Sequence, residues 1–175
     1  FMKTRELAFC GIFAALIAIG AYIRIDIPLP MYTMHFTLQW LFVLMAVFLL
    51  GRKGGTVSVI VYIVIGLAGI PVFAAGGGPG YVLRPGFGFL LGFAAASAAA
   101  GTVMKVFKAN KLKYLIAASA VGLAVYYAAG ALYFYFIKNV YIGDAVPFSV
   151  IVLQYCLITI IPDFILCIAA SFISF

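Results

Sequence analysis

Residues 66–93 read GLAGIPVFAAGGGPGYVLRPGFGFLLGF, with nine glycines, three prolines and one arginine between two apolar stretches. A helix facing lipid does not tolerate this composition, because each unpaired backbone N–H or C=O in hydrocarbon costs several kcal/mol. The stretch must therefore pack inside a helix bundle or line a pocket at its mouth. Its aromatic and apolar residues argue against disorder. We interpret it as a binding loop and the rest of the chain as its scaffold.

The overall composition predicts a membrane protein. Of the 175 residues, 67% are hydrophobic and 9% are charged, which a soluble domain of this size does not tolerate. The length fits a single domain, residues 1–175. The net charge of +7 is spread over short clusters between apolar runs, which is the pattern of membrane topology and not of nucleic-acid binding. Three cysteines lie inside apolar runs at no metal-ligand spacing, and we interpret them as small buried hydrophobic residues: Cys10, Cys156 and Cys167.

The expected fold is an all-α integral membrane protein, a bundle of six transmembrane helices with the glycine-rich loop between the third and the fourth. The predicted spans are residues 6–23, 35–50, 56–69, 86–107, 114–137 and 147–175. The third is short, about 21 Å at 1.5 Å per residue, so the glycine-rich loop must complete that crossing. The last segment would measure about 43 Å as one straight helix, longer than a hydrocarbon core of about 30 Å. Pro162 offers the break, with an inner helix starting near Asp163.

Small residues at helical spacing predict close helix packing in two of the spans. In the fourth span they are Gly88, Gly92, Ala96 and Ala100. In the first they are Ala8, Gly11, Ala15 and Ala18, with Ala14 four residues before Ala18. From spacing alone, internal packing of the first helix is favoured over docking to another protein.

The distribution of basic residues predicts the orientation. With a cytoplasmic N-terminus, eight basic residues fall on the inside: Lys3, Arg5, Arg52, Lys53, Lys105, Lys108, Lys111 and Lys113. Three fall on the outside: Arg24, Arg84 and Lys138. Cytoplasmic loops carry the excess of Lys and Arg, so we expect the N-terminus inside and a pocket that opens outward.

Few polar groups are available to such a pocket. Thr37 and Gln39 stand at the start of the second span, beside Trp40, which is either a pocket residue or an interfacial anchor. Asp163 is an acid at membrane depth, which marks a candidate site. The tyrosines of the fifth span (Tyr126, Tyr127, Tyr133 and Tyr135) either form an interfacial belt or line an aromatic pocket.

The sequence carries no recognisable catalytic chemistry. It has no GxxxxGK[ST] phosphate loop, so the chain is not expected to hydrolyse ATP itself. His35, the single histidine, has no acidic neighbour at triad spacing, and no catalytic or metal-binding role is assigned. No inverted repeat of the kind that alternating-access carriers use is visible. A solute pocket in a chain that has neither an ATP-hydrolysing motif nor an inverted repeat indicates a subunit that captures a solute. Other subunits would then move that solute across the membrane.

Four motifs, in order along nearly the whole chain, resemble the BioY family. They are FTLQ (36–39), GLAGIPVFAAGGGPGY (66–81), RPGFGFLLGF (84–93) and the late Pro162–Asp163 pair. The resemblance implies the biotin-binding S component of an energy-coupling factor (ECF) transporter. Such a subunit has six helices, sits in a prokaryotic cell membrane and works with a transmembrane T component and two cytoplasmic ATPases. Biotin is then the transported ligand and no cofactor is expected.

The resemblance also implies roles for particular residues. Small alanines of the first helix would meet the T component, and Ala14 and Ala18 fit that AxxxA pattern. The ligand-binding candidates are Thr37, Gln39, Gly77, Gly78, Tyr81, Arg84 and Asp163. Asp163, Gln39 and Thr37 suit the ureido group of biotin, and Arg84, or else Lys138, suits its carboxylate. The glycines either let backbone approach the ligand or form a tight turn without ligand contact.

One departure from the family keeps alternatives open. Many BioY sequences have lysine three residues after the aspartate, where this chain has Leu166. Either Arg84 supplies the cation or the ligand differs at its polar end. The first alternative is therefore the same class of subunit with another cofactor, such as lipoate. A stand-alone ion-coupled carrier or channel is the second, and a membrane enzyme is the least supported.

Overall fold

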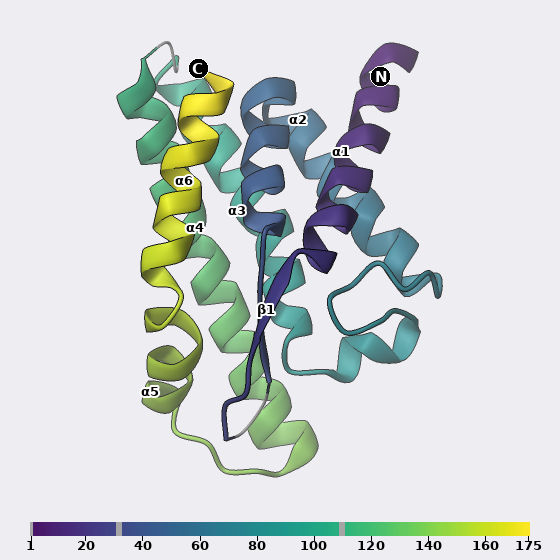
Figure 1. Ribbon diagram of the computed structural model, residues 1–175, viewed down its shortest axis with the longest axis vertical. Helices are drawn as coiled ribbons and strands as arrows, with labels where there is room; N and C mark the ends of the chain where they lie inside the picture. The colour runs from purple at the N-terminus through teal and green to yellow at the C-terminus, as the bar shows by residue number, and fades with distance from the viewer. Residues whose placement is uncertain (1, 31–32, 109–110) are drawn as a thin grey trace.

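The computed structural model describes residues 2–30, 33–108 and 111–175 (Figure 1). Among these described residues, four helices are long and apolar enough to cross a membrane: α1 (Thr4–Tyr22), α2 (Gln39–Leu67), α3 (Phe87–Val106) and α4, which spans Leu112–Phe136 and continues as the π-helical turn η2 (Ile137–Ile142). A bent pair forms one further candidate span: α5 (Phe148–Ile151) with the π-helical turn η3 (Val152–Leu157), and α6 (Ile160–Ser174). The prediction of a helical, multi-pass membrane protein is confirmed.

Helix α2 reverses direction at Gly51. This residue has φ 74° and ψ 179°, which is not helical, and glycine adopts such a positive φ without strain. The Gln39 Nε2 and Tyr62 hydroxyl atoms lie 2.6 Å apart, although 23 residues of straight helix would separate them by about 34 Å. The two halves of α2 therefore lie side by side (Figure 1). The sequence predicted a break here, at residues 51–55.

Helices α3 and α4 pack closely through the small residues of α3, as predicted. An added Cβ at Gly92 would lie 2.8 Å from the Tyr126 carbonyl oxygen, and one at Gly88 would lie 2.3 Å from Tyr133 Cβ. Farther along the same face, Ala96 and Ala100 are fully buried. The stripe thus lets two backbones approach one another without side chains between them.

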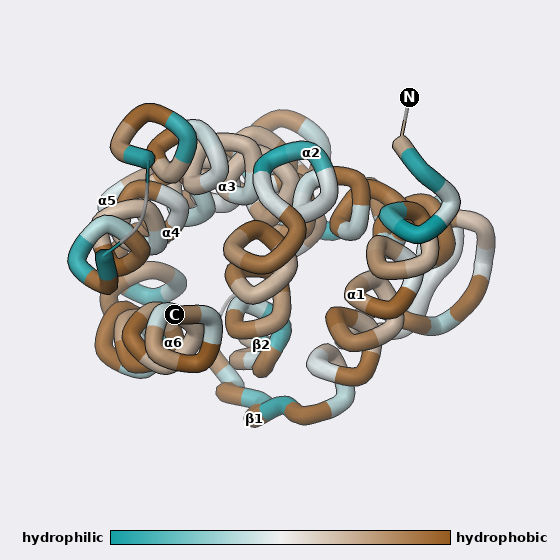
Figure 2. Tube along the Cα trace, turned by 90° about the horizontal axis from the view of Figure 1, so that it is seen from above, coloured by the Kyte–Doolittle hydropathy of each residue, from teal (hydrophilic) through white to brown (hydrophobic). Residues whose placement is uncertain are grey.

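A β-hairpin between α1 and α2 is a correction to the all-α prediction. Strands β1 (Arg24–Ile27) and β2 (Met34–Thr37) pair antiparallel, with Arg24 opposite Thr37 and Asp26 opposite His35. The second span therefore begins as extended chain and becomes helical only at Gln39. Strand β1 lies on the outside of the bundle and β2 on its inside (Figure 2). Because the two strands pair with each other, the backbone N–H and C=O groups on their facing edges are hydrogen-bonded. A single extended segment would leave these groups without partners.

The glycine-rich segment between α2 and α3 folds back onto the bundle. Its only helix is the 3₁₀ turn η1 (Pro79–Leu83). Phe73 is buried against Gly66, where even a methyl group would collide with the ring. The Gly78 N–H donates to the Gly66 carbonyl at 2.7 Å, and the Tyr22 hydroxyl donates to the Pro71 carbonyl. The segment is therefore anchored to both α1 and α2.

The last segment bends by 47° where η3 meets α6. The sequence predicted a break at Pro162, but α6 already begins at Ile160. The predicted break therefore exists, and it lies a few residues before the predicted position. Pro162 falls in the first turn of α6, where backbone N–H groups have no partner within the helix. Proline is tolerated there, and the bend falls just before it.

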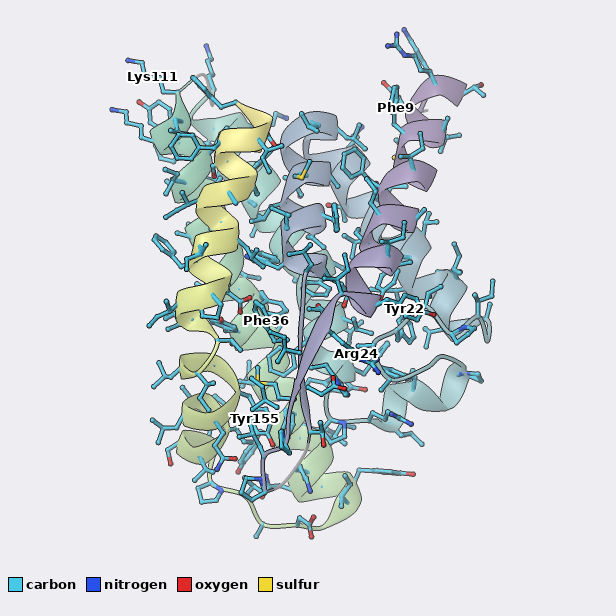
Figure 3. All side chains as sticks on the ribbon, in the orientation of Figure 1. Phe9, Tyr22, Arg24, Phe36, Lys111 and Tyr155 are labelled. Carbon is cyan, nitrogen blue, oxygen red and sulfur yellow. The ribbon has the colours of Figure 1, made fainter. Side chains whose placement is uncertain are left out.

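The two ends of the bundle are formed by different parts of the chain. The start of α1, the reversal in α2, the end of α3, the start of α4 and the end of α6 lie at one end, and Lys111 stands there (Figure 3). The hairpin, η1 and η2 occupy the other half, where Arg24 and Tyr155 lie (Figure 3).

Candidate functional site

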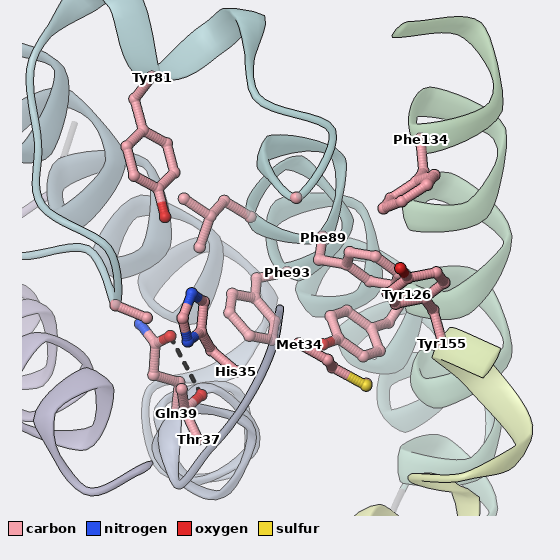
Figure 4. A pocket seen from close by; sticks show the side chains of 13 residues that line it. Met34, His35, Thr37, Gln39, Tyr81, Phe89, Phe93, Tyr126, Phe134 and Tyr155 are labelled. Atoms are coloured by element: carbon pink, nitrogen blue, oxygen red, sulfur yellow. Dashed lines mark hydrogen bonds between the residues drawn. The ribbon is translucent and has the colours of Figure 1, made fainter. Parts of the chain in front are cut away.

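Two adjoining cavities lie beneath the β-hairpin, in the half of the bundle away from the termini. The first is lined by Met34, His35, Thr37, Gln39, Ala74, Tyr81, Gly86, Phe89, Leu90, Phe93, Tyr126, Phe134 and Tyr155 (Figure 4). The second is lined by Met34, His35, Phe36, Thr37, Trp40, Phe93, Tyr126, Thr159 and Asp163. Because five residues line both, we treat the cavities as one site with two ends.

Three stacked aromatic rings form one wall of this site. The Phe93 and Tyr126 rings are 4.9 Å apart and nearly parallel, with 2° between their planes, and the Trp40 ring lies 5.3 Å from Tyr126. Helices α2, α3 and α4 each contribute one ring. Flat apolar walls of this kind suit a small ring system. The pocket reading of Tyr126, one of the two alternatives for the tyrosines of the fifth span, is confirmed.

At one end of the site, a chain of hydrogen bonds joins the hairpin to the glycine-rich segment. The Thr37 hydroxyl donates to Gln39 Oε1 at 3.2 Å (Figure 4), and Gln39 Nε2 donates to the Tyr62 hydroxyl at 2.6 Å. Tyr62 in turn donates to the Val72 carbonyl at 3.2 Å. Gln39 and Tyr62 are almost fully buried, so these bonds fix the orientation of the Gln39 carboxamide.

Asp163 marks the other end of the site. It lies in the first turn of α6 and is 5% exposed. The Tyr127 hydroxyl donates to its Oδ2 at 2.5 Å, and the Thr159 hydroxyl lies 3.2 Å from that of Tyr127. A carboxylate accepts hydrogen bonds only, so Asp163 is suited to receive N–H donors from a ligand.

His35 is a site residue that sequence reasoning missed. Its Nδ1 lies 2.6 Å from Asp26 Oδ1, and Arg24 Nε lies 3.3 Å from the same oxygen. The sequence showed no acidic neighbour of this histidine at triad spacing, but strand pairing brings Asp26, nine positions away, into contact with it. The hydrogen bond from His35 lowers the pKa of Asp26 below its usual value, so this carboxyl is ionised at neutral pH. Within the described ranges, no three or more His, Cys, Asp or Glu side chains are grouped to hold a metal ion.

The predicted ligand-binding residues fall into two groups. Thr37, Gln39, Tyr81 and Asp163 line the site. Gly77, Gly78 and Arg84 are not among its described lining residues. A Cβ at Gly77 would lie 2.4 Å from the Ile70 carbonyl oxygen, and Gly78 has φ 100°, so both glycines have a role in the packing of the segment itself. Their contact with a ligand stays a prediction.

Neither cation that was predicted to meet a ligand carboxylate points into the site. Arg84 is exposed, and its guanidinium lies 5.1 Å from the centre of the Tyr81 ring. Lys138 is buried but ion-paired with Asp144 at 2.9 Å. Both stand beside groups that already stabilise their charge.

The two alanines with a predicted docking role lie on the inward side of α1. Ala14 is 3% exposed and belongs to the main hydrophobic core, and Ala18 is partly buried against that core. Their positions agree with internal packing of the helix, the reading that spacing alone favoured. Whether a partner also reaches them stays a prediction.

These features define a class of protein: a membrane-embedded helical bundle that holds a small solute in an aromatic pocket near one face. The chain belongs to the BioY family, whose model matches residues 1–175. The resemblance drawn from its motifs is thereby confirmed.

The chain is also similar to individual proteins of known class. It is 40% identical to a probable biotin transporter BioY of Lysinibacillus sphaericus, over 98% of this chain and 86% of the relative. It is 37% identical to the biotin transporter BioY of Thermotoga maritima, over 80% and 78% of the two chains. A crystal structure of the S-component for biotin from an ECF-type ABC transporter matches with a TM-score of 0.84 at 25% identity, covering 99% of this chain and 93% of that one. The family is one of transporter subunits and not of enzymes, as the sequence predicted.

Proposed function

We propose that this chain is the biotin-binding S component of an ECF transporter, which captures biotin at the outer face of a prokaryotic cell membrane. The names of its relatives support this function. The observation that carries it is the form of the site: an aromatic wall for a ring system, a hydrogen-bonding pair at one end and a buried acid at the other. The ureido group of biotin offers both N–H donors and a carbonyl acceptor to such groups.

We further infer six membrane crossings with the N-terminus in the cytoplasm. The reversal at Gly51 divides α2 into two antiparallel halves, and these halves with α1, α3, α4 and the bent α5–α6 pair make six. Basic residues of two different segments gather near the termini: Arg52, Lys53 and Lys105 line a common groove there with Met2. Such an excess of positive charge is typical of the cytoplasmic side.

The proposed subunit works with a T component and two ATPases. Ala14 is buried in the bundle core, so a T component that docks on α1 would first meet the exposed small residues beside it. These are Ala8, Gly11 and Ala15. Small residues on a lipid-facing surface allow a second helix to lie close, and Ala14 and Ala18 then support that surface from within.

Titration of the purified protein with biotin by calorimetry tests the proposal. Asp163→Asn should weaken biotin binding by at least about tenfold, because charge-assisted hydrogen bonds contribute about 1.5–3 kcal/mol. It should affect lipoate little, since lipoate has no ureido group. Glu6→Gln, at the opposite end of the bundle, is the control and should bind as the wild type does. Failure of the wild type to bind biotin at micromolar concentration would refute the function, and tighter binding of lipoate would favour the alternative cofactor.

A further inference from the structure

His35 occupies a special position in the site. It lines both cavities, and Figure 4 shows its ring pointing inward among Gln39, Tyr81 and Phe93. The ring is held from behind, because Nδ1 faces Asp26 on the outer strand β1. Nε2 is on the opposite edge of the ring. A carboxylate partner on Nδ1 sets the orientation of an imidazole and determines which nitrogen is presented to a ligand.

The charges around the site are strongly asymmetric. The described residues that line the two cavities include one acid, Asp163, and neither lysine nor arginine. Arg84 and Lys138 are engaged elsewhere, with the Tyr81 ring and with Asp144. His35 is thus the one side chain among them that can carry a positive charge. A carboxylate buried without a cation is strongly disfavoured.

We propose that His35 binds the carboxylate of the ligand through the ring edge that bears Nε2, and that Asp26 is its positioning residue. This proposal rests on the proposed function, because it assigns the acidic end of a biotin-like ligand to one side chain. In the bound state the imidazole carries both protons: Nδ1–H donates to Asp26, and Nε2–H donates to the ligand.

Other titratable or charged groups surround His35, and each must be separated from it in a test. Asp26 and Arg24 lie on β1, behind the ring. Tyr81 on η1, Tyr126 on α4 and Asp163 on α6 line the same cavities. A neutral ligand of the same shape separates them, because its head still meets Asp163 while its tail carries no charge. We therefore use biotin and its carboxamide, biotinamide, as the matched pair.

The decisive experiment measures both affinities for wild type and for His35→Gln in one buffer at neutral pH. Glutamine keeps hydrogen-bonding capacity and cannot be protonated. We expect His35→Gln to weaken biotin about tenfold to a hundredfold, the range of a charge-assisted hydrogen bond, and biotinamide no more than about twofold.

Each other outcome has a fixed meaning. Equal weakening of both ligands by His35→Gln would overturn the proposal. If His35→Gln fails to fold, Asp26→Asn decides: equal weakening of biotin and biotinamide by that variant would overturn it. Asp26→Asn keeps the histidine and should weaken biotin selectively, by less than His35→Gln does. A wild type that binds neither ligand contradicts the proposed function instead.

Discussion

At the scale of single residues, Tyr62 connects the hairpin side of the site to the glycine-rich segment. Its hydroxyl accepts from Gln39 and donates to the Val72 carbonyl, and its ring meets Phe73 edge-on at 5.5 Å. Tyr62 is 1% exposed, so water cannot replace it. The side chain that orients Gln39 therefore comes from the far half of α2, which approaches only because the helix reverses at Gly51.

We predict that Tyr62→Phe destabilises the protein and weakens ligand binding. The substitution leaves the Gln39 amide and the Val72 carbonyl without their partner, at a cost of about 1–3 kcal/mol. Thermal unfolding and calorimetric titration of biotin should both show the loss. Tyr135→Phe, at a tyrosine that is 40% exposed, is the control and should change neither quantity. An unaltered affinity in Tyr62→Phe would show that Gln39 needs no such orientation.

Among the site residues, the sequence predicted those that share a motif and missed those that meet only through strand pairing. Thr37 and Gln39 are two positions apart and were recognised together. Asp26 and His35 are nine positions apart, and their contact depends on the register of β1 and β2. Nothing in the spacing fixes that register, because two strands of four residues with two prolines between them are equally consistent with an irregular loop.

At the scale of elements, the glycine-rich segment owes its shape to a few close approaches. Gly77 packs on the Ile70 carbonyl, and Gly66 lies beneath the Phe73 ring. Gly80, three residues beyond Gly77, has open space around the position of a Cβ. The glycines of this segment are thus not equivalent, although they look alike in sequence.

We predict that alanine at Gly77 destabilises the protein and that alanine at Gly80 does not. Gly77→Ala places a methyl group 2.4 Å from a backbone oxygen, and overpacking of this kind costs about 1–3 kcal/mol. The melting temperature should fall and biotin affinity should fall with it, since Ala74 and Tyr81 of the same segment line the site. Gly80→Ala should leave both unchanged. Equal behaviour of the two variants would mean that the segment tolerates rearrangement.

The sequence predicted the elements that depend on the length of an apolar run or on a cluster of glycines. The long apolar runs became helices, and the GRKGG sequence at residues 51–55 became a reversal because Gly51 adopts a positive φ. The hairpin was missed, since its strands are too short for a clear alternation of polar and apolar residues. The bend before α6 was placed too late, because proline is accommodated within the first turn of a helix.

At the scale of the whole molecule, the separation of the two ends makes the orientation testable. Ala145 is exposed in the connection that follows η2, and Thr4 is exposed at the start of α1. The three native cysteines are buried, so they should react slowly with a membrane-impermeant maleimide.

We predict that Ala145→Cys is labelled in intact cells and that Thr4→Cys is labelled only after the membrane is opened. This follows from a cytoplasmic N-terminus and an outward-facing site. Mass spectrometry of the purified protein measures the labelled fraction. Wild type, with its buried cysteines, is the control for background. Labelling in the reverse order would invert the proposed orientation and place the pocket on the cytoplasmic side.

The chain contains a single tryptophan, and the fold has put it in the wall of the solute pocket. Trp40 is 2% exposed, stacks with Tyr126 and Phe93, and donates from Nε1 to the Cys167 sulfur at 3.2 Å. Its emission therefore arises from one known place, next to a sulfur atom and beside the space that a solute would fill. The unlabelled protein carries its own optical reporter of occupancy, readable in detergent, in vesicles or in an assembled transporter.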